Sequence, residues 1–293
     1  MNIGIAGIGR MGSAMAIRLL GLEHAVTLWN RTPEKMQAAL AAGATAVATP
    51  AELASRCDVI ITILTDAAAI EAVYAGADGL LSGALAGKLL IDMSTVRPET
   101  VRALATRVAL AQADFVECPV GGTIGPAREG KLFGFVGADA AAFERAKPVL
   151  LQLCRRLEHI GPVGSGASMK LAINLPLIVF WRALGEALTL TRPLGLDPAR
   201  LIDIFADTSG AATVLKNRGA SVAKALAGES TGPVAFDLDS MRKDLRTMLA
   251  EAKGLGVELP TTAGVLASFD AAVAAGQGGL DGVEIPAWVS RAK

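Results

Sequence analysis

The chain begins Met1-Asn2-Ile3-Gly4-Ile5-Ala6-Gly7-Ile8-Gly9-Arg10-Met11-Gly12, and this stretch decides the fold. Its first half is a short apolar run typical of a buried strand, and the pattern that follows is typical of a helix. The glycines between them have Gly-x-Gly-x-x-Gly spacing, which brings a helix N-terminus up to a pyrophosphate. A glycine-rich turn without a ligand is the alternative. We expect a dinucleotide site that includes Gly7, Ile8, Gly9, Arg10, Met11 and Gly12.

Strand-like and helical patterns alternate through the first half of the chain, which predicts βαβ units and a largely parallel sheet. From about Gly166 onward only helical patterns follow one another. We therefore predict an α/β Rossmann-type doubly wound sheet in residues 1–162. An all-helical C-terminal domain in residues 163–293 would bind the substrate and form the dimer contact. The predicted strands are Ile3–Ala6, Ala25–Trp29, Val59–Leu64, Leu89–Asp92, Phe115–Glu117 and Phe133–Val136.

Composition limits the partners and the compartment. Hydrophobic residues make up 52% of the 293 residues, and 28 basic residues balance 28 acidic ones. A chain without net charge is not expected to bind nucleic acid or an anionic membrane surface. The apolar run Leu171–Trp181 is shorter than the about 20 residues of a membrane helix. Few cysteines, no metal-ligand spacing and no signal-peptide pattern predict a cytoplasmic protein without a bound metal.

The end of the second strand indicates which dinucleotide is bound. An NAD-selective site usually carries an acidic residue here, which bonds the ribose 2′-hydroxyl. This chain has Asn30, Arg31 and Thr32 instead. A guanidinium can pair with a 2′-phosphate and stack on adenine, so we expect NADP (NADPH) to be preferred over NAD. Arg31 as a solvated turn residue is the alternative.

Lys170 begins a long apolar helical pattern, four residues before Asn174. On a helix this spacing places an amine and an amide on one face. An ammonium that faces an apolar interior is costly unless a partner compensates it. Such a cost is typical of sites that bind or transform an anionic substrate, whereas a lysine that reaches the solvent is the alternative. Pro176 is expected to kink this helix one turn later.

Two further segments are expected at strand ends, Asp92-Met93-Ser94-Thr95 and Cys118-Pro119-Val120-Gly121-Gly122-Thr123. With the N-terminal glycines and the Lys170 segment, in this order, they resemble the β-hydroxyacid dehydrogenase family over essentially the whole chain. That family includes 3-hydroxyisobutyrate dehydrogenase, tartronate semialdehyde reductase and glyoxylate/succinic semialdehyde reductase. The resemblance implies an oxidoreductase that interconverts a small 3-hydroxy acid and its semialdehyde or keto acid by hydride transfer.

The resemblance also implies residue roles. Lys170 matches the catalytic lysine, which exchanges a proton with the carbonyl or hydroxyl oxygen, and Asn174 matches the amide that orients the substrate. Ser94 and Thr95 could instead form a capping turn, and Lys243 could be a solvated lysine. Substrate binding is implied for Ser94, Gly121, Gly122 and Thr123, and cofactor binding for Leu64, Thr65, Thr95, Val120 and Lys243.

One departure from the family concerns the substrate. Many members carry Pro-Val-Ser-Gly-Gly, whose serine hydroxyl binds the substrate carboxylate. Gly121 stands at the serine position here, and Thr123 replaces the second glycine. One hydrogen-bond donor is lost, so a small anionic substrate is expected but its identity stays open.

Two other functions fit the same architecture. One is an imine reductase-like NADPH enzyme, which usually has another residue where Lys170 stands, and the other is a dehydrogenase-like binding module without turnover. The presence of both Lys170 and Asn174 argues against each. Because Leu171–Trp181 is apolar nearly all round, we expect it to be buried within the domain or between subunits. The family resemblance implies a homodimer or homotetramer.

Overall fold

The computed structural model describes residues 1–291, which form two compact units. The first unit is Met1–Leu171, and the second begins at Ala172. The predicted boundary at residue 162 lies just before helix α8 (Ser165–Thr191), whereas the compact units divide inside that helix.

The first unit is built on one mixed sheet with strand order β3-β2-β1-β4-β5-β6-β8-β7, and β9 pairs with β8. The first six strands in this order are parallel to one another, as in a doubly wound nucleotide-binding fold. The strands are β1 (Asn2–Ala6), β2 (Ala25–Trp29), β3 (Thr45–Ala46), β4 (Val59–Thr62), β5 (Leu89–Asp92), β6 (Asp114–Glu117), β7 (Val120–Gly121), β8 (Leu132–Gly137) and β9 (Cys154–Gly161).

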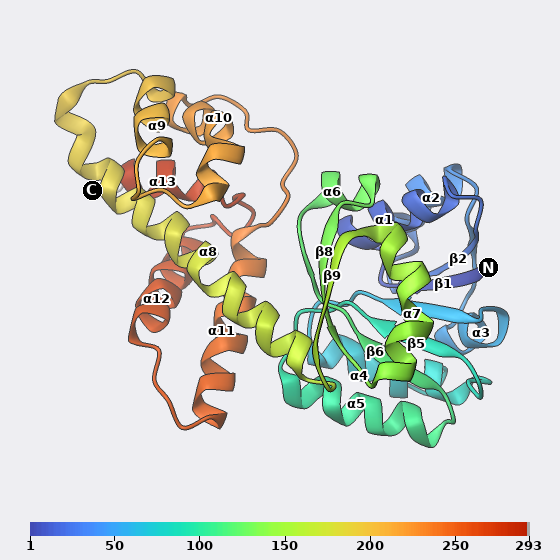
Figure 1. The fold of residues 1–293 in the computed structure, drawn as a ribbon. Coiled ribbons are helices and arrows are strands. Elements are labelled where there is room, and N and C mark those ends of the chain that lie inside the picture. Colours follow the sequence, from blue (N-terminus) through green and yellow to red (C-terminus); the bar gives the residue numbers. More distant parts are fainter. Residues whose placement is uncertain (292–293) are drawn as a thin grey trace. The chain divides into compact units, whose positions relative to one another are not determined.

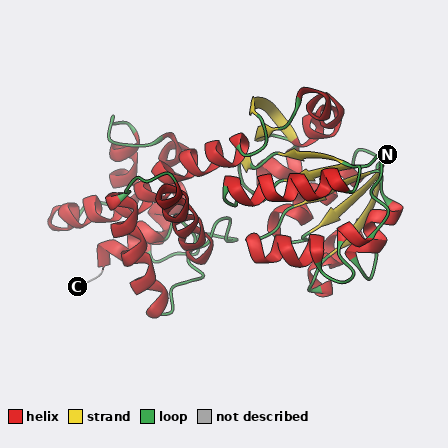
Figure 2. Ribbon diagram, turned by 90° about the horizontal axis from the view of Figure 1, so that it is seen from below, coloured by secondary structure: helices red, strands yellow, loops and turns green. Residues whose placement is uncertain are grey.

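Helices cover both faces of this sheet (Figures 1 and 2). Alternate strand residues supply two separate cores, because successive side chains point to opposite faces. Ile61 and Ile91 belong to one core, and Ile60 and Leu90 to the other. The helices are α1 (Arg10–Leu20), α2 (Gln37–Ala41), α3 (Pro50–Arg56), α4 (Ala67–Ala75), α5 (Pro98–Leu110), α6 (Ile124–Glu129) and α7 (Ala140–Leu153), with short 3-10 turns at Pro33–Met36 and Leu80–Ser82.

The predicted α/β Rossmann-type sheet followed by helices is confirmed, and each predicted strand is present. The sequence did not indicate β3, β7 or β9. The first two have only two residues each, and β9 reads Cys-Arg-Arg-Leu-Glu-His-Ile-Gly, in which two Arg, one Glu and one His interrupt the apolar pattern. It pairs only with β8, at an edge of the sheet where charged side chains are tolerated.

The second unit is helical throughout the part that the structure describes. Helix α13 was not predicted, because it is short and lies close to the C-terminus. The elements after α8 are a 3-10 turn (Arg192–Leu194), α9 (Pro198–Ala206), α10 (Thr213–Ala227), α11 (Leu238–Gly254), α12 (Pro260–Ala274) and α13 (Ile285–Arg291).

Helix α8, with 27 residues, is the longest of the described helices, and it is strongly apolar. The helical stretch Ser165–Leu194 is long and apolar enough to cross a membrane by length and composition, so the apolar run is longer than the eleven residues singled out in the sequence. A core helix of a globular domain meets the same two criteria. In α8, Ile178, Trp181, Leu184 and Leu188 are buried. The helix continues through Pro176.

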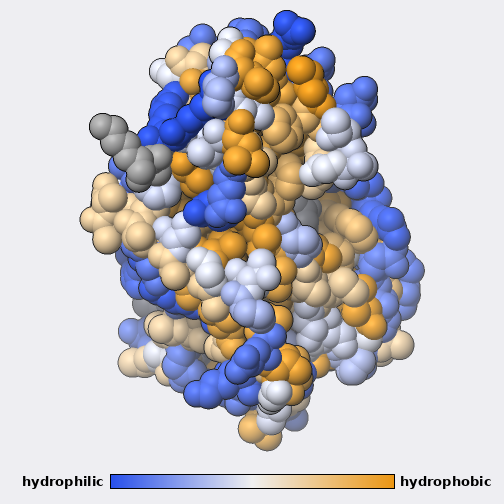
Figure 3. All heavy atoms as spheres, turned by 90° about the vertical axis from the view of Figure 1, so that its left-hand side faces the viewer, coloured by the Kyte–Doolittle hydropathy of each residue, from blue (hydrophilic) through white to orange (hydrophobic). Residues whose placement is uncertain are grey.

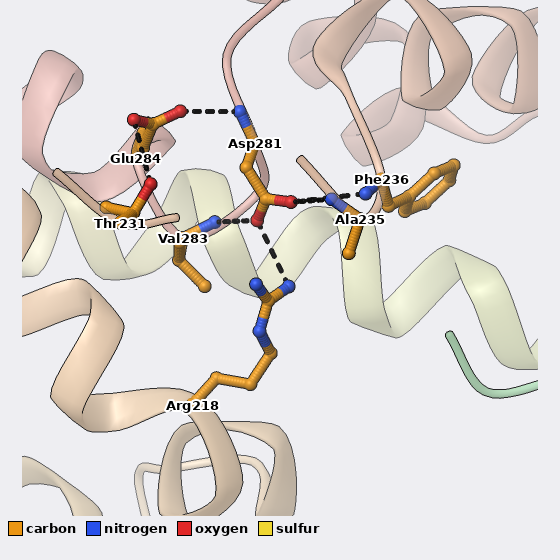
Figure 4. Close-up of polar contacts among 7 residues, drawn as sticks. All are labelled: Arg218, Thr231, Ala235, Phe236, Asp281, Val283 and Glu284. Carbon is orange, nitrogen blue, oxygen red and sulfur yellow. Dashed lines mark hydrogen bonds and ion pairs between the residues drawn. The ribbon is translucent and has the colours of Figure 1, made fainter. Parts of the chain in front are cut away.

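A buried carboxylate organises the segments between the helices of the second unit (Figure 4). Asp281 is 1% exposed, and it forms an ion pair with Arg218 at 3.0 Å. It also accepts backbone N–H groups of Ala235, Phe236 and Val283 at 2.6, 3.2 and 3.0 Å. Two sequence-distant segments are thereby joined immediately before α11 and α13.

We expect Asp281→Asn to destabilise the second unit by about 3 kcal/mol, because Arg218 and the backbone donors lose their anionic partner in a buried site. Urea unfolding followed by circular dichroism measures this loss. The matched control is Asp270→Asn, whose carboxylate is 41% exposed and pairs with the exposed Arg246 and the partly buried Arg242; we expect a cost below about 1 kcal/mol. Equal losses in the two variants would show that Asp281 has no special structural role.

Candidate functional site

The carboxyl ends of the parallel strands lie in one row. The register pairs Trp29 with Ala6, Ala6 with Thr62, Thr62 with Asp92, and Asp92 with Glu117. Ligands of doubly wound sheets bind outside this edge. The predicted cofactor and substrate segments of the first unit follow the ends of these strands, so the fold gathers them at one edge.

The glycine turn after β1 is shaped as the sequence predicts. Gly7 has a φ of +101°, and a Cβ there would lie 2.3 Å from the Ile63 carbonyl oxygen. A Cβ on Gly12 would lie 2.1 Å from the carbonyl oxygen of Gly7, so helix α1 and strand β1 pack at backbone distance. A Cβ on Gly9 would meet nothing within 4 Å, and no side chain caps α1 there. The N-terminus of α1 can therefore receive an anion such as a pyrophosphate.

Asn30 holds this turn in place. Its Oδ1 accepts the Ile8 N–H at 2.9 Å, and its Nδ2 donates to the Thr32 carbonyl at 2.7 Å. The amide thus connects the end of β2 to the glycine turn. Arg31 and Thr32 beside it are exposed. Of the three predicted residues, Arg31 and Thr32 are exposed to solvent, whereas Asn30 bonds the backbone on either side of it.

Behind the edge lies a buried chain of hydroxyls and one carboxylate. Asp92 accepts hydrogen bonds from Thr62 Oγ1 at 2.6 Å and Ser94 Oγ at 2.8 Å, and the Tyr74 hydroxyl lies 2.9 Å from Thr62 Oγ1. Burial raises the pKa of Asp92 to about 6, and the Thr62 and Ser94 bonds oppose this rise. The same burial raises the pKa of Tyr74 well above its ordinary value.

Ser94 is therefore tied into the protein itself. Its hydroxyl gives its one proton to Asp92 and accepts the N–H of Leu64 at 2.9 Å. The Ser94 hydroxyl therefore has no proton left to donate to a substrate, and its oxygen could accept one more hydrogen bond through its second lone pair. The bond also fixes the backbone of the predicted cofactor loop at Leu64. Thr65 next to it is exposed, and Thr95 is partly exposed.

The segment after β6 forms the short strand β7, with Val120 opposite Gly134 and Gly121 opposite Phe133. Val120 is buried, Gly122 is exposed with a φ of +127°, and Thr123 stands before α6. A Cβ on Gly121 would have its nearest neighbour, Phe135, at 3.7 Å. This is an ordinary contact, so a small side chain would fit at this position.

Lys170 lies on the first turns of α8 and is 9% exposed. The carboxylate of Glu117, at the end of β6, accepts three backbone N–H groups at the start of that helix. The distances are 2.5 Å from Gly164, 2.9 Å from Gly166 and 3.2 Å from Ala167. Burial raises the pKa of Glu117 to about 7, the three N–H groups oppose this rise, and the charge of Asp92 adds to it.

Asp244, which follows Lys243 and is expected to be structural rather than catalytic, contacts two predicted site residues. It is 3% exposed, accepts Asn174 Nδ2 at 2.9 Å and pairs with Lys243 Nζ at 2.5 Å. The carboxylate thereby joins two predicted site residues, from α8 and α11. The signal in the sequence is its place directly after Lys243, in Arg242-Lys243-Asp244-Leu245.

Among the described residues, no three His, Cys, Asp or Glu side chains are arranged to hold a metal ion. Cys57, Cys118 and Cys154 are buried free thiols, as expected. His24 contacts Gln152, and His159 contacts the Ala138 carbonyl, so both take part in structural contacts.

Comparison with known proteins covers the whole chain. Residues 2–161 match the family model of the NAD binding domain of 6-phosphogluconate dehydrogenase, and residues 164–288 match the family model described as NAD-binding of NADP-dependent 3-hydroxyisobutyrate dehydrogenase. The chain is 35% identical to glyoxylate/succinic semialdehyde reductase 1 of Arabidopsis thaliana over 281 residues, 96% of each protein. It is 34% identical to 3-hydroxyisobutyrate dehydrogenase of Pseudomonas aeruginosa, over 88% of each protein.

Solved structures agree. That of Mycobacterium tuberculosis 3-hydroxyisobutyrate dehydrogenase with L-serine has a TM-score of 0.85 and 26% identity, with 99% of both chains covered. Psf3, in complex with NADP+, has a TM-score of 0.87 and 25% identity, with 98% of this chain and 99% of that chain covered. An imine reductase of Myxococcus stipitatus, at a TM-score of 0.65 and 21% identity over 97% of this chain and 98% of that one, shares the fold. The chain therefore belongs to the β-hydroxyacid dehydrogenase family, and it is a nicotinamide-dependent oxidoreductase that acts on CH–OH groups.

Proposed function

We propose that the protein is an NADP-dependent reductase and dehydrogenase that interconverts a small 3-hydroxy acid and its semialdehyde or keto acid. Lys170 is its general acid and base. The observation that carries this proposal is the burial of Lys170 at 9% exposure, on a helix whose start is bonded to the cofactor edge of the sheet. A cation held at this position can bind an anionic substrate and stabilise negative charge that develops on it during the reaction.

The chemistry of carbonyl reduction requires such a group. Bound NADPH supplies the hydride. As the carbonyl carbon accepts it, negative charge builds on the carbonyl oxygen. The Lys170 ammonium stabilises that charge and donates a proton to the oxygen, and in the oxidation direction the neutral amine accepts the hydroxyl proton.

The preference for NADPH rests on charge. The position after β2 has no carboxylate to repel a 2′-phosphate, and the exposed Arg31 guanidinium is available to pair with it. Thr32 adds a hydroxyl donor. Arg10, exposed at the first residue of α1, adds a second cation beside the glycine turn.

The proposed substrate is small and anionic. Backbone N–H groups at Gly121 and Gly122, with Thr123, would receive its carboxylate, and Asn174 would orient it. The Asn174 amide is itself oriented by the buried carboxylate of Asp244. That bond fixes which end of the side chain is the amide nitrogen and which is the oxygen.

We also propose a cytoplasmic homodimer or homotetramer that binds neither nucleic acid nor membrane. The zero net charge supports the proposal that the protein binds neither nucleic acid nor membrane. The buried free thiols support a cytoplasmic location. Large apolar side chains are exposed in the second unit, with Leu190 at 83% and Leu194 at 63%. Figure 3 shows apolar surface between charged side chains. Association between subunits would cover such surface.

Lys170→Ala tests the reaction. We expect kcat with NADPH and short semialdehydes or keto acids to fall by about 10²–10⁴-fold, because the proton donor is lost. NADPH affinity, measured by fluorescence titration, should change little. Lys170→Arg keeps the charge but holds its proton too tightly to exchange it, so it should stay impaired. The exposed Lys147→Ala is the control. Turnover retained in Lys170→Ala would refute the assigned role.

Arg31→Ala tests the cofactor preference. We expect kcat/KM for NADPH to fall by about tenfold or more, since a charge-assisted pair with the 2′-phosphate is lost, while kcat/KM for NADH changes by less than about twofold. Arg56→Ala, at an exposed position of the same unit, should leave both values unchanged. A wild-type preference for NADH would contradict the proposal.

Gly121→Ser tests the substrate loop. Because a Cβ fits there at 3.7 Å from its nearest neighbour, the variant should fold normally. The added hydroxyl should lower KM for small hydroxy and keto acids by about tenfold or more, because a hydrogen bond to a charged group contributes about 1.5–3 kcal/mol. Steady-state kinetics with a panel of such acids measures this. An unchanged KM across the panel would mean that the substrate carboxylate lies elsewhere.

A further inference from the structure

Glu117 is a buried carboxylate that the proposed mechanism does not use. It ends strand β6 and is 0% exposed. Burial of an acidic side chain is costly unless hydrogen bonds satisfy it. Here the satisfying donors are not side chains but backbone N–H groups of a different segment, 47 to 50 residues later in the chain.

Those donors belong to the start of α8. The first N–H groups of a helix have no acceptor within the helix. Gly166 and Ala167 lie in the first turn, and Gly164 directly precedes it. Their bonds to Glu117 are the capping contacts of α8, and a carboxylate is the favoured partner at a helix N-terminus.

The surrounding backbone leaves the carboxylate and the helix little freedom. A Cβ on Gly137 would lie 2.1 Å from Glu117 Oε1, and a Cβ on Gly166 would lie 2.3 Å from the Phe135 carbonyl oxygen. The start of α8 thus lies against β8 at backbone distance. A shift of the helix start would break the Glu117 bonds or compress these contacts.

Two proposed site segments lie next to this contact in the sequence. Lys170 is three residues after Ala167, less than one turn along α8. In the other direction, Glu117 runs directly into Cys118 and the loop that contains Gly121 and Gly122. From this juxtaposition we infer that Glu117 is a positioning residue for the reaction: its carboxylate fixes the first turn of α8 and so sets the place of the Lys170 amine relative to the substrate loop.

This inference rests on the proposed role of Lys170. Glutamine fills nearly the same volume as glutamate, but it replaces one acceptor oxygen by an NH2 donor. In Glu117→Gln that donor would face backbone N–H groups, so at least one bond of the cap is lost. Misplacement of a reacting group by about 1 Å can cost about 10²-fold in rate.

The test compares Glu117→Gln, Lys170→Ala and the double variant in the full-length protein. We expect Glu117→Gln to lower kcat by at least about tenfold, with NADPH affinity within about twofold of wild type. In the Lys170→Ala background the same substitution should lower the residual kcat by less than about twofold, because residues that act through one another are not additive. Amide hydrogen exchange at Gly164, Gly166 and Ala167 should become faster.

The control is Asp139→Ala. Asp139 caps α7 in the same unit by accepting the Ala142 N–H at 2.8 Å, so its loss removes a comparable helix cap away from Lys170. It should lower the melting temperature without changing kcat. If Glu117→Gln does not fold, Glu117→Asp is used in its place, because it keeps the charge and shortens the side chain by one methylene. The same assays are then carried out on it.

The outcomes separate the two claims. Unchanged kcat in a Glu117 variant whose amides exchange faster would overturn the positioning role. An equal loss of kcat in the wild-type and Lys170→Ala backgrounds would overturn it too, since Glu117 would then not act through the lysine. If Lys170→Ala itself keeps full turnover, the proposed function fails, whatever the Glu117 variants do.

Discussion

The bond between the Glu117 carboxylate and the start of α8 is the constraint on which the site depends. The parallel strands end in one row, and Glu117 is the last member of that row. Its carboxylate accepts hydrogen bonds from three backbone N–H groups at the start of α8, the helix that bears Lys170. The glycine turn, the Leu64 loop and the substrate loop are fixed by the sheet, and this contact fixes the lysine in the same frame.

A second constraint has the same chemical character. Asp92, one strand away, holds Ser94, and Ser94 holds the Leu64 backbone. In each case a buried carboxylate at a strand end organises a backbone segment that carries no charge of its own. Asp281 does the same for the helical unit through Ala235 and Phe236. Buried polar groups of this kind are costly when unpaired, so every partner has to be in place.

The sequence predicts the fold well because its signals are local. Gly7, Gly9 and Gly12 impose one backbone geometry, and the alternation of apolar runs follows from the two-sided sheet. The edge strand β9 and the carboxylates Glu117, Asp92 and Asp244 were not predicted as determinants, since their roles come from partners far away in the chain. Asn30 is a further example. The sequence shows that its side chain is neutral, but not that it hydrogen-bonds the Ile8 N–H and the Thr32 carbonyl. The cofactor preference and the roles of individual site residues stay predictions.

Ionisation of Glu117 and Asp92 does not add to the folding stability at neutral pH. Their pKa values are raised from 4.5 to about 7 and from 3.8 to about 6. Between the lower and the higher value of each group, the folded chain binds more protons than the unfolded chain, so folding stability falls as pH rises. Above about pH 7 both carboxylates are charged, and the fold bears the full cost of burying them. An apolar pair would avoid that cost but would leave the N–H groups of α8 and the hydroxyl of Ser94 without acceptors. What the two carboxylates contribute is therefore a fixed geometry at the sheet edge, which is the property that a hydride-transfer site requires.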